Sequence, residues 1–135
     1  MSYWLRLFTP GSTYKKSARL VAIAWTLLIL ILCFMPAREI PDIKVPFIDK
    51  WTHFVLFAGF SIAWLCALPS LKWYRLLLVF LASVLFGSLI EIFQGILVFL
   101  GRSCELMDAV ADGVGGLLGV IIFALLARVA KARKL

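Results

Sequence analysis

The sequence has few acidic residues and lacks the common signatures of soluble enzymes. Asp and Glu together number 7 among 135 residues, against 14 Lys and Arg. No G-x-S-x-G, P-loop or other nucleotide-binding signature is present, which argues against ATP-driven chemistry. The single histidine is not part of an H-E-x-x-H pattern, and the 3 cysteines form no C-x-x-C pair. These absences argue against the familiar zinc motifs and against a paired-cysteine framework.

Long polar stretches are also lacking, since 64% of the residues are hydrophobic. A helix needs about 20 apolar residues to cross the hydrocarbon core of a bilayer. The predicted spans are Leu20–Met35, Trp51–Leu68, Leu76–Leu100 and Ala109–Ala127. They leave no room for a separate soluble domain. The sequence therefore predicts an all-α membrane protein, a bundle of four transmembrane helices.

The basic residues are unevenly distributed between the two sides of these spans. One side has Arg6, Lys15, Lys16, Arg19, Lys72, Arg75, Arg128, Lys131, Arg133 and Lys134, and the other has Arg38, Lys44, Lys50 and Arg102. Lys and Arg in short loops mark the cytoplasmic side, so both termini are predicted to be cytoplasmic. Residues 1–19 are then a basic cytoplasmic or interfacial segment, 20–127 a membrane domain, and 128–135 a basic tail. Basic residues at span ends meet lipid headgroups, so we do not expect nucleic-acid binding.

The acidic residues are confined to the side with few basic residues. Glu39, Asp42, Asp49, Glu105 and Asp108 fall outside the membrane, and Glu91 and Asp112 fall in the outer half of the bilayer. Ionisable side chains at that depth are costly and mark functional sites, so we predict a site that faces the outer leaflet. Arg102 and Gln94 are the expected partners of Glu91. The alternative for Glu91 is a structural hydrogen bond between helices.

Helical spacing groups the other polar residues. Asp49 and His53 are four apart, so they share a helix face, and Asp49 could orient the His53 ring or accept N–H groups of its own first turn. Asp108 and Asp112 are also four apart. Asp108 could simply cap its helix, whereas Asp112 is already inside it. His53 is either a packing residue or a ligand.

Two further expectations concern packing and metals. Small residues allow close approach of membrane helices, so Gly87, Gly115 and Gly119 are predicted to lie at helix contacts. The oxygen-rich set comprises Asp49, His53, Glu91, Asp108 and Asp112. Ca²⁺ or Mg²⁺ prefers such oxygens, but no established metal-binding spacing is present. We therefore predict no metal and no other cofactor, with a divalent cation as the alternative.

Four segments of the chain resemble the VanZ-like family of small bacterial membrane proteins. They are D-K-W-T-H-F-V-L-F from Asp49 to Phe57, E-I-F-Q from Glu91 to Gln94, Arg102-Ser103 with Asp108, and D-G-V-G from Asp112 to Gly115 with Gly119. The family often has asparagine at the position of Asp112. The resemblance implies a multi-pass protein of the bacterial cytoplasmic membrane. The founding member of the family is associated with low-level resistance to the glycopeptide antibiotic teicoplanin.

The leading functional prediction is binding of an amphiphile in an outward-facing polar pocket. The amphiphile would be a cell-wall lipid precursor, a phospholipid headgroup or a lipoglycopeptide, and the role would be in resistance or envelope homeostasis. The predicted binding residues are Asp49, His53, Glu91, Gln94, Arg102, Ser103, Asp108 and Asp112. One alternative is a membrane-embedded enzyme with Glu91 or Asp108 as general base and His53 as proton shuttle. Another is a transport or assembly subunit that pairs with a second membrane protein.

Overall fold

The computed structural model describes residues 14–40, 44–68 and 71–132. Its elements are α1 (Lys15–Cys33), the 3-10 helix η2 (Ala37–Glu39), α2 (Ile48–Ala67), α3 (Trp73–Ile96), the 3-10 helix η3 (Val98–Leu100) and α4 (Leu106–Ala132). All four α-helices are long and apolar enough to cross a membrane. The prediction of an all-α membrane bundle of four helices is confirmed. Predicted features at 1–13, 41–43 (with Asp42) and 133–135 lie outside the described residues.

All four helices begin three to five residues before the predicted spans, at Lys15, Ile48, Trp73 and Leu106. Helices α1 and α4 continue into their basic flanks, to Lys15 and Ala132, because the predicted spans counted only apolar residues. Helix α3 ends at Ile96, four residues before the predicted end at Leu100. The chain then forms η3 and turns at Gly101, whose φ of 67° is a left-handed conformation that glycine adopts at little cost. Apolar composition alone could not distinguish this turn from more helix.

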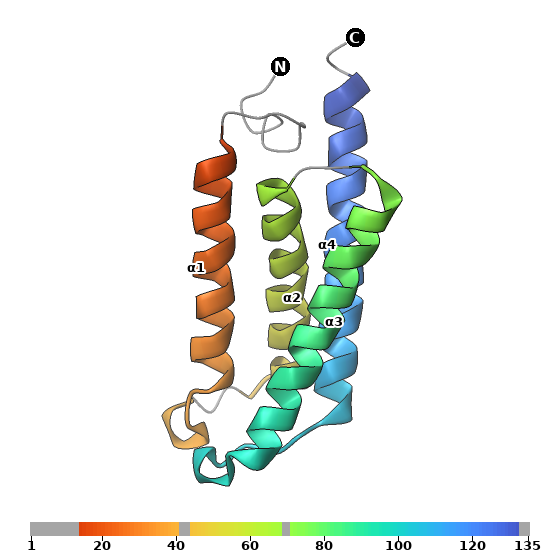
Figure 1. The fold of residues 1–135 in the computed structure, drawn as a ribbon. Helices are drawn as coiled ribbons and strands as arrows, with labels where there is room; N and C mark the ends of the chain where they lie inside the picture. Colours follow the sequence, from red (N-terminus) through yellow and green to blue (C-terminus); the bar gives the residue numbers. More distant parts are fainter. Residues whose placement is uncertain (1–13, 41–43, 69–70, 133–135) are drawn as a thin grey trace.

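The four helices run alternately up and down (Figure 1). The start of α1 and the end of α4 therefore lie at one end of the bundle, together with the link between α2 and α3. The links that contain η2 and η3 lie at the opposite end. We call this second end the link end, because the polar side chains described below gather there.

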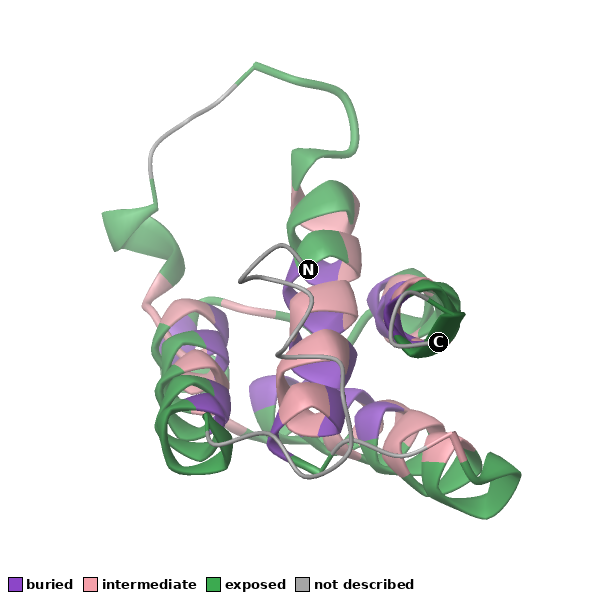
Figure 2. Ribbon diagram, turned by 90° about the horizontal axis from the view of Figure 1, so that it is seen from above, coloured by how far each residue is buried: buried purple, intermediate pink, exposed green. Residues whose placement is uncertain are grey.

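Helix α2 lies between α1 on one side and α3 and α4 on the other (Figures 1 and 2). Its buried side chains, with Phe57 and Leu65 fully enclosed, face the neighbouring helices. The outer faces carry exposed large apolar side chains such as Leu20, Leu78 and Leu85. Only part of each helix is buried inside the protein. The remaining apolar surface is suited to contact with lipid.

Helix α1 is attached to α2 through two tryptophans. Trp25 Nε1 donates a hydrogen bond of 2.8 Å to the Leu56 carbonyl oxygen, and the Trp25 ring packs against Gly59. Trp64 Nε1 donates to the Thr26 hydroxyl at 3.1 Å. The indole N–H groups thus find partners within the membrane, where an unpaired donor would be costly.

Helices α2 and α4 approach most closely at glycines of α4. A Cβ at Gly115 would collide with the backbone carbonyl of Phe54, and one at Gly119 would collide with that of Ala58. Gly87 of α3 makes similar room for the side chain of Asp112. These glycines allow the backbones to pack directly against one another, as in other membrane helix pairs.

This close contact yields a first prediction. We expect Gly115→Ala to lower the free energy of unfolding by about 1–3 kcal/mol, because the added methyl group overpacks the α2–α4 contact. Gly113→Ala is the matched control, since a Cβ there would lie 3.8 Å from Val84 Cγ2, an ordinary contact. Reversible unfolding in detergent measures both. Equal stability of the two variants would contradict the packing described here.

Candidate functional site

A cluster of buried polar side chains lies at the link end of the bundle. Its members are His53 from α2, Glu91 and Gln94 from α3, and Asp108 and Asp112 from α4, all at most 4% exposed. The structure thus brings together five of the residues that the sequence singled out. Asp49, Arg102 and Ser103 lie around them, nearer the surface.

The centre of the cluster is the imidazole of His53. Its Nδ1 lies 3.0 Å from Asp112 Oδ1 and 3.9 Å from Glu91 Oε1. The carboxylate within hydrogen-bond distance of the ring is therefore Asp112 of α4, whereas Asp49, the residue expected to orient the ring, offers an oxygen within 4.8 Å of a ring nitrogen. Helical spacing placed Asp49 on the correct face, but the close packing of α4 brings Asp112 into direct contact with the ring.

The structure pairs Glu91 with neither Arg102 nor Gln94, the two residues expected to be its partners. Its Oε2 accepts a hydrogen bond of 2.9 Å from the backbone N–H of Glu105, in the link that precedes α4. Gln94 Nε2 instead donates to the Cys33 carbonyl oxygen at 2.8 Å, at the end of α1. Arg102 also binds α1. The link before α4 therefore covers Glu91. The separation of these residues in the sequence did not indicate this contact.

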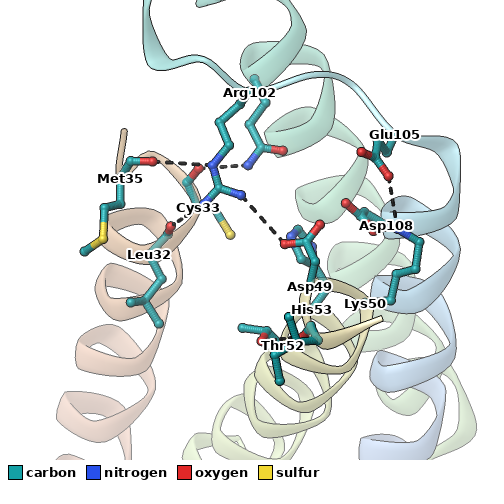
Figure 3. Close-up of polar contacts among 12 residues, drawn as sticks. Leu32, Cys33, Met35, Asp49, Lys50, Thr52, His53, Arg102, Glu105 and Asp108 are labelled. Atoms are coloured by element: carbon teal, nitrogen blue, oxygen red, sulfur yellow. Dashed lines mark hydrogen bonds and ion pairs between the residues drawn. The ribbon is translucent and has the colours of Figure 1, made fainter. Parts of the chain in front are cut away.

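Arg102 joins α1, the η3 link and α2 (Figure 3). Its Nη2 and Nε donate to the carbonyl oxygens of Leu32 and Met35 at 3.3 and 3.4 Å, and its Nη1 lies 3.7 Å from Asp49 Oδ1. The last carbonyls of a helix have no partner within it and favour a nearby cation. The last turn of α1 has no basic residue of its own, so Arg102 supplies the charge from another part of the chain.

Lys50 and Glu105 belong to the cluster, although the sequence-based site omitted them. Lys50 Nζ lies 3.0 Å from Glu105 Oε2 and 3.1 Å from Asp108 Oδ1. The Ser103 hydroxyl donates to Glu105 Oε1 at 3.4 Å. The sequence did contain a signal for Lys50, because this residue directly follows Asp49 in the D-K-W-T-H segment. The sequence analysis used Lys50 only as a marker of membrane topology.

The proposed capping roles of the two aspartates are not what the structure shows. Helix α2 begins after Phe47, which makes no side-chain capping bond, and Asp49 pairs with Arg102 instead. Asp108 lies inside the first turn of α4, and its carboxylate is paired with Lys50. Asp49 therefore joins α2 to the link before α4, and Asp108 joins α4 to α2.

The cluster has two layers. The outer layer contains the ion pairs Arg102–Asp49 and Lys50–Glu105, whose side chains are partly exposed. The inner layer contains His53, Glu91 and Asp112, all at most 3% exposed. Two sets of donor atoms within 4.8 Å of one another could hold a metal ion, namely Asp49 with His53 and Asp108, and His53 with Glu91 and Asp112.

Two apolar grooves lie on the sides of the bundle. The first, of about 450 Å³, runs between α2 and α4 at the link end and is lined by Phe47, Trp51, Phe54, Val110, Ala111 and Val114, with Lys50 on its border. The second, of about 350 Å³, lies between α1 and α2 toward the other end and is lined by Val21, Trp25 and Ala63 among others. A charged side chain lines only the first of these two grooves.

Four apolar helices with a polar cluster at one end define a small multi-pass membrane protein. The chain belongs to the VanZ/LLP1 family, whose model matches residues 3–127. The resemblance noted from Asp49 onward is confirmed, and the match extends it through α1. No curated protein and no solved structure matches the chain.

The contacts of Arg102 lead to a second prediction. We expect Arg102→Gln to weaken the last turn of α1 by about 2 kcal/mol, because two carbonyls lose charged hydrogen bonds. Amide hydrogen exchange of the peptides that cover 28–40 measures this local opening. Arg38→Gln is the control, since the Arg38 side chain is 84% exposed and lies 3.9 Å from the Glu39 carboxylate. Unchanged exchange in Arg102→Gln would contradict the role given to Arg102.

Proposed function

We propose that this protein binds an amphiphile of the outer leaflet at the link end of its bundle. The observation that carries the proposal is the apolar groove between α2 and α4, which has Lys50 and the polar cluster at its border. An amphiphile needs these two surfaces next to each other, one for its chain and one for its headgroup.

The groove suits an acyl or similar chain. Its volume of about 450 Å³ lies in the range of pockets that enclose small ligands. It opens sideways toward the membrane, and its lining is aromatic and aliphatic, with Trp51 and Phe54 in edge-to-face contact at 5.9 Å. A chain could therefore enter from the bilayer without crossing water.

The outer layer of the cluster suits a polar headgroup. Lys50 and Arg102 can pair with a phosphate or carboxylate, and Asp49, Ser103 and Glu105 can bind hydroxyl or amine groups. Beneath these side chains, inside the bundle, lie the buried residues His53, Glu91, Gln94, Asp108 and Asp112. Ligands with this chemistry include cell-wall lipid precursors, phospholipids and lipoglycopeptides such as teicoplanin. The membership in the VanZ/LLP1 family supports the last class and a role in resistance.

The proposal that the site faces the outer leaflet depends on how the helices are oriented in the membrane. The distribution of Lys and Arg supports cytoplasmic termini, as the positive-inside rule requires, in a bacterial cytoplasmic membrane. The alternating helices then direct the link end outward. The cluster would lie at the depth of the outer headgroups.

A third prediction tests binding. Native mass spectrometry of the protein, gently extracted from its own membranes, is expected to show a retained amphiphile. We expect Ala111→Phe to lose it, because the ring fills the α2–α4 groove, and Lys50→Gln to lose most of it, because the headgroup loses its cation. The mass of the retained molecule would identify its class.

Two matched variants control this experiment. Ala63→Phe fills the second groove, in which none of the described lining residues is charged, and Lys44→Gln removes an exposed lysine before α2. Both are expected to retain the amphiphile. Absence of any bound amphiphile from the wild type would refute the proposal, and a stoichiometric second chain instead would favour the assembly-subunit alternative.

A fourth prediction tests topology through the natural cysteines. Cys104 is exposed in the link before α4, whereas Cys33 is buried. A membrane-impermeant maleimide should therefore label intact protoplasts at Cys104, and Cys104→Ser should abolish that labelling. Cys66 is partly exposed at the opposite end of α2, so the test uses a Cys66→Ser background. In that background, labelling that appears only after permeabilisation would place the link end in the cytoplasm and exclude an outer-leaflet site.

The contact between His53 and Asp112 favours one second candidate, a membrane-embedded enzyme that acts on a lipid-linked substrate. A histidine oriented by a carboxylate, with Glu91 beside it, is an arrangement that general acid–base catalysis uses. Glu91→Gln distinguishes the two functions. Loss of turnover with the amphiphile still bound would indicate an enzyme, whereas loss of the amphiphile itself would indicate binding alone.

A further inference from the structure

We propose that His53, Glu91 and Asp112 bind one Zn²⁺ ion in the inner layer of the cluster. This inference goes beyond amphiphile binding and does not depend on it. The three residues come from α2, α3 and α4, so the ion would join the helices at the place where they converge. The sequence-based prediction was that no metal is bound, and the arrangement of the donor atoms is the reason to propose otherwise.

The distances between the donor atoms fit a small tetrahedral ion. Zinc lies about 2.0–2.2 Å from nitrogen and carboxylate oxygen ligands, which places neighbouring tetrahedral ligands roughly 3.3–3.5 Å apart. His53 Nδ1 lies 3.0 Å from Asp112 Oδ1 and 3.9 Å from Glu91 Oε1. These distances lie on either side of the required value, so small side-chain rotations would suffice. Three protein ligands leave a fourth position for water or another ligand.

Two carboxylate oxygens of this set have no hydrogen-bond partner among the described residues. They are Glu91 Oε1 and Asp112 Oδ2, both buried. The other oxygen of Glu91 is held by the backbone N–H of Glu105, which directs Oε1 toward the His53 ring. Metal-binding carboxylates are commonly oriented by such a second hydrogen bond. A buried oxygen directed at an imidazole therefore points to a ligand between them.

The charge balance distinguishes the inner set from the other set of donors. Asp108 is paired with Lys50 at 3.1 Å, and Asp49 lies 3.7 Å from Arg102 and is partly exposed. In the described part of the chain, no Lys or Arg pairs with Glu91 or Asp112. The one basic side chain beside both carboxylates is His53 among the described residues, and it can neutralise at most one of them. A divalent ion would balance both buried charges.

The ligand types favour zinc over calcium or magnesium. Ca²⁺ takes six to eight oxygen ligands and Mg²⁺ keeps several waters, which a set of three buried side chains does not provide. An imidazole nitrogen with two carboxylates is instead a ligand combination that Zn²⁺ accepts. No cysteine is required, in agreement with the absence of a cysteine zinc motif.

The fifth prediction tests this site on the full-length protein in detergent, after treatment with a chelator. Titration with Zn²⁺ alone, in competition with a fluorescent zinc indicator, should give one ion per chain. Asp112→Asn and Glu91→Gln should each weaken binding at least about tenfold. Glu39→Gln, which alters an exposed carboxylate beside Arg38, should bind as the wild type does.

Further measurements make the test decisive even if a variant folds poorly. X-ray absorption at the zinc edge of the wild type should show nitrogen and oxygen ligands with one imidazole, and sulfur scattering would overturn the assignment. Failure of the wild type to bind Zn²⁺ would overturn the proposal. So would equal binding by Asp112→Asn and wild type, or loss of binding in Asp49→Asn and Asp108→Asn with retention in Asp112→Asn.

Discussion

The contact between α2 and α4 is the constraint on which the rest of this structure depends. The Gly115 backbone packs directly against the Phe54 carbonyl, so the two helices approach more closely than any side chain would permit. That approach brings Asp112, one turn earlier in α4, to 3.0 Å from His53, one residue before Phe54 in α2. Gly87 then lets α3 pack against the Asp112 carboxylate, which places Glu91, four residues later, beside the same ring.

The end of α1 at the link end of the bundle depends on the same cluster rather than on its own sequence. Its last carbonyl oxygens accept hydrogen bonds from Gln94 of α3 and from Arg102 of the following link. A helix end at a membrane interface must satisfy these groups or remain hydrated. The polar residues at the link end therefore have two roles. Gln94, Arg102 and Glu91 satisfy backbone groups at helix ends, and Glu91 also lies beside His53 and Asp112 in the inner layer.

This division of roles shapes the functional interpretation. Gln94 already uses one amide N–H to hold the end of α1, through its bond to the Cys33 carbonyl oxygen. The outer ion pairs of Lys50 and Arg102 are partly exposed and adjoin an apolar groove. A ligand headgroup can compete for such pairs, since exposed ion pairs are individually weak. The inner histidine and carboxylates are protected from that competition, which suits a bound ion or proton transfer.

Part of the site was accessible from the sequence because membrane proteins tolerate few buried charges. Glu91 and Asp112 were recognised by depth, and His53 by its spacing from Asp49, and the structure does bring the three together. The groups that contact these three residues could not be predicted from the sequence, because such contacts depend on how the helices rotate and cross. Lys50 was counted only as a topology marker. Glu105 contributes its carboxylate to Lys50 and its backbone N–H to Glu91, and no side-chain pattern can indicate the second contact.

The sequence by itself determined the class of the protein. Four apolar stretches are each long enough to cross a membrane, and a helix satisfies its backbone groups within lipid, so the sequence predicts a multi-pass helical membrane protein. An even number of spans places the start of the first helix and the end of the last on one side. The tertiary structure decided which carboxylate meets His53, where α3 ends, and that the groove borders Lys50. The physical reason is that composition fixes burial in the membrane, whereas contacts between helices depend on close packing at single glycines.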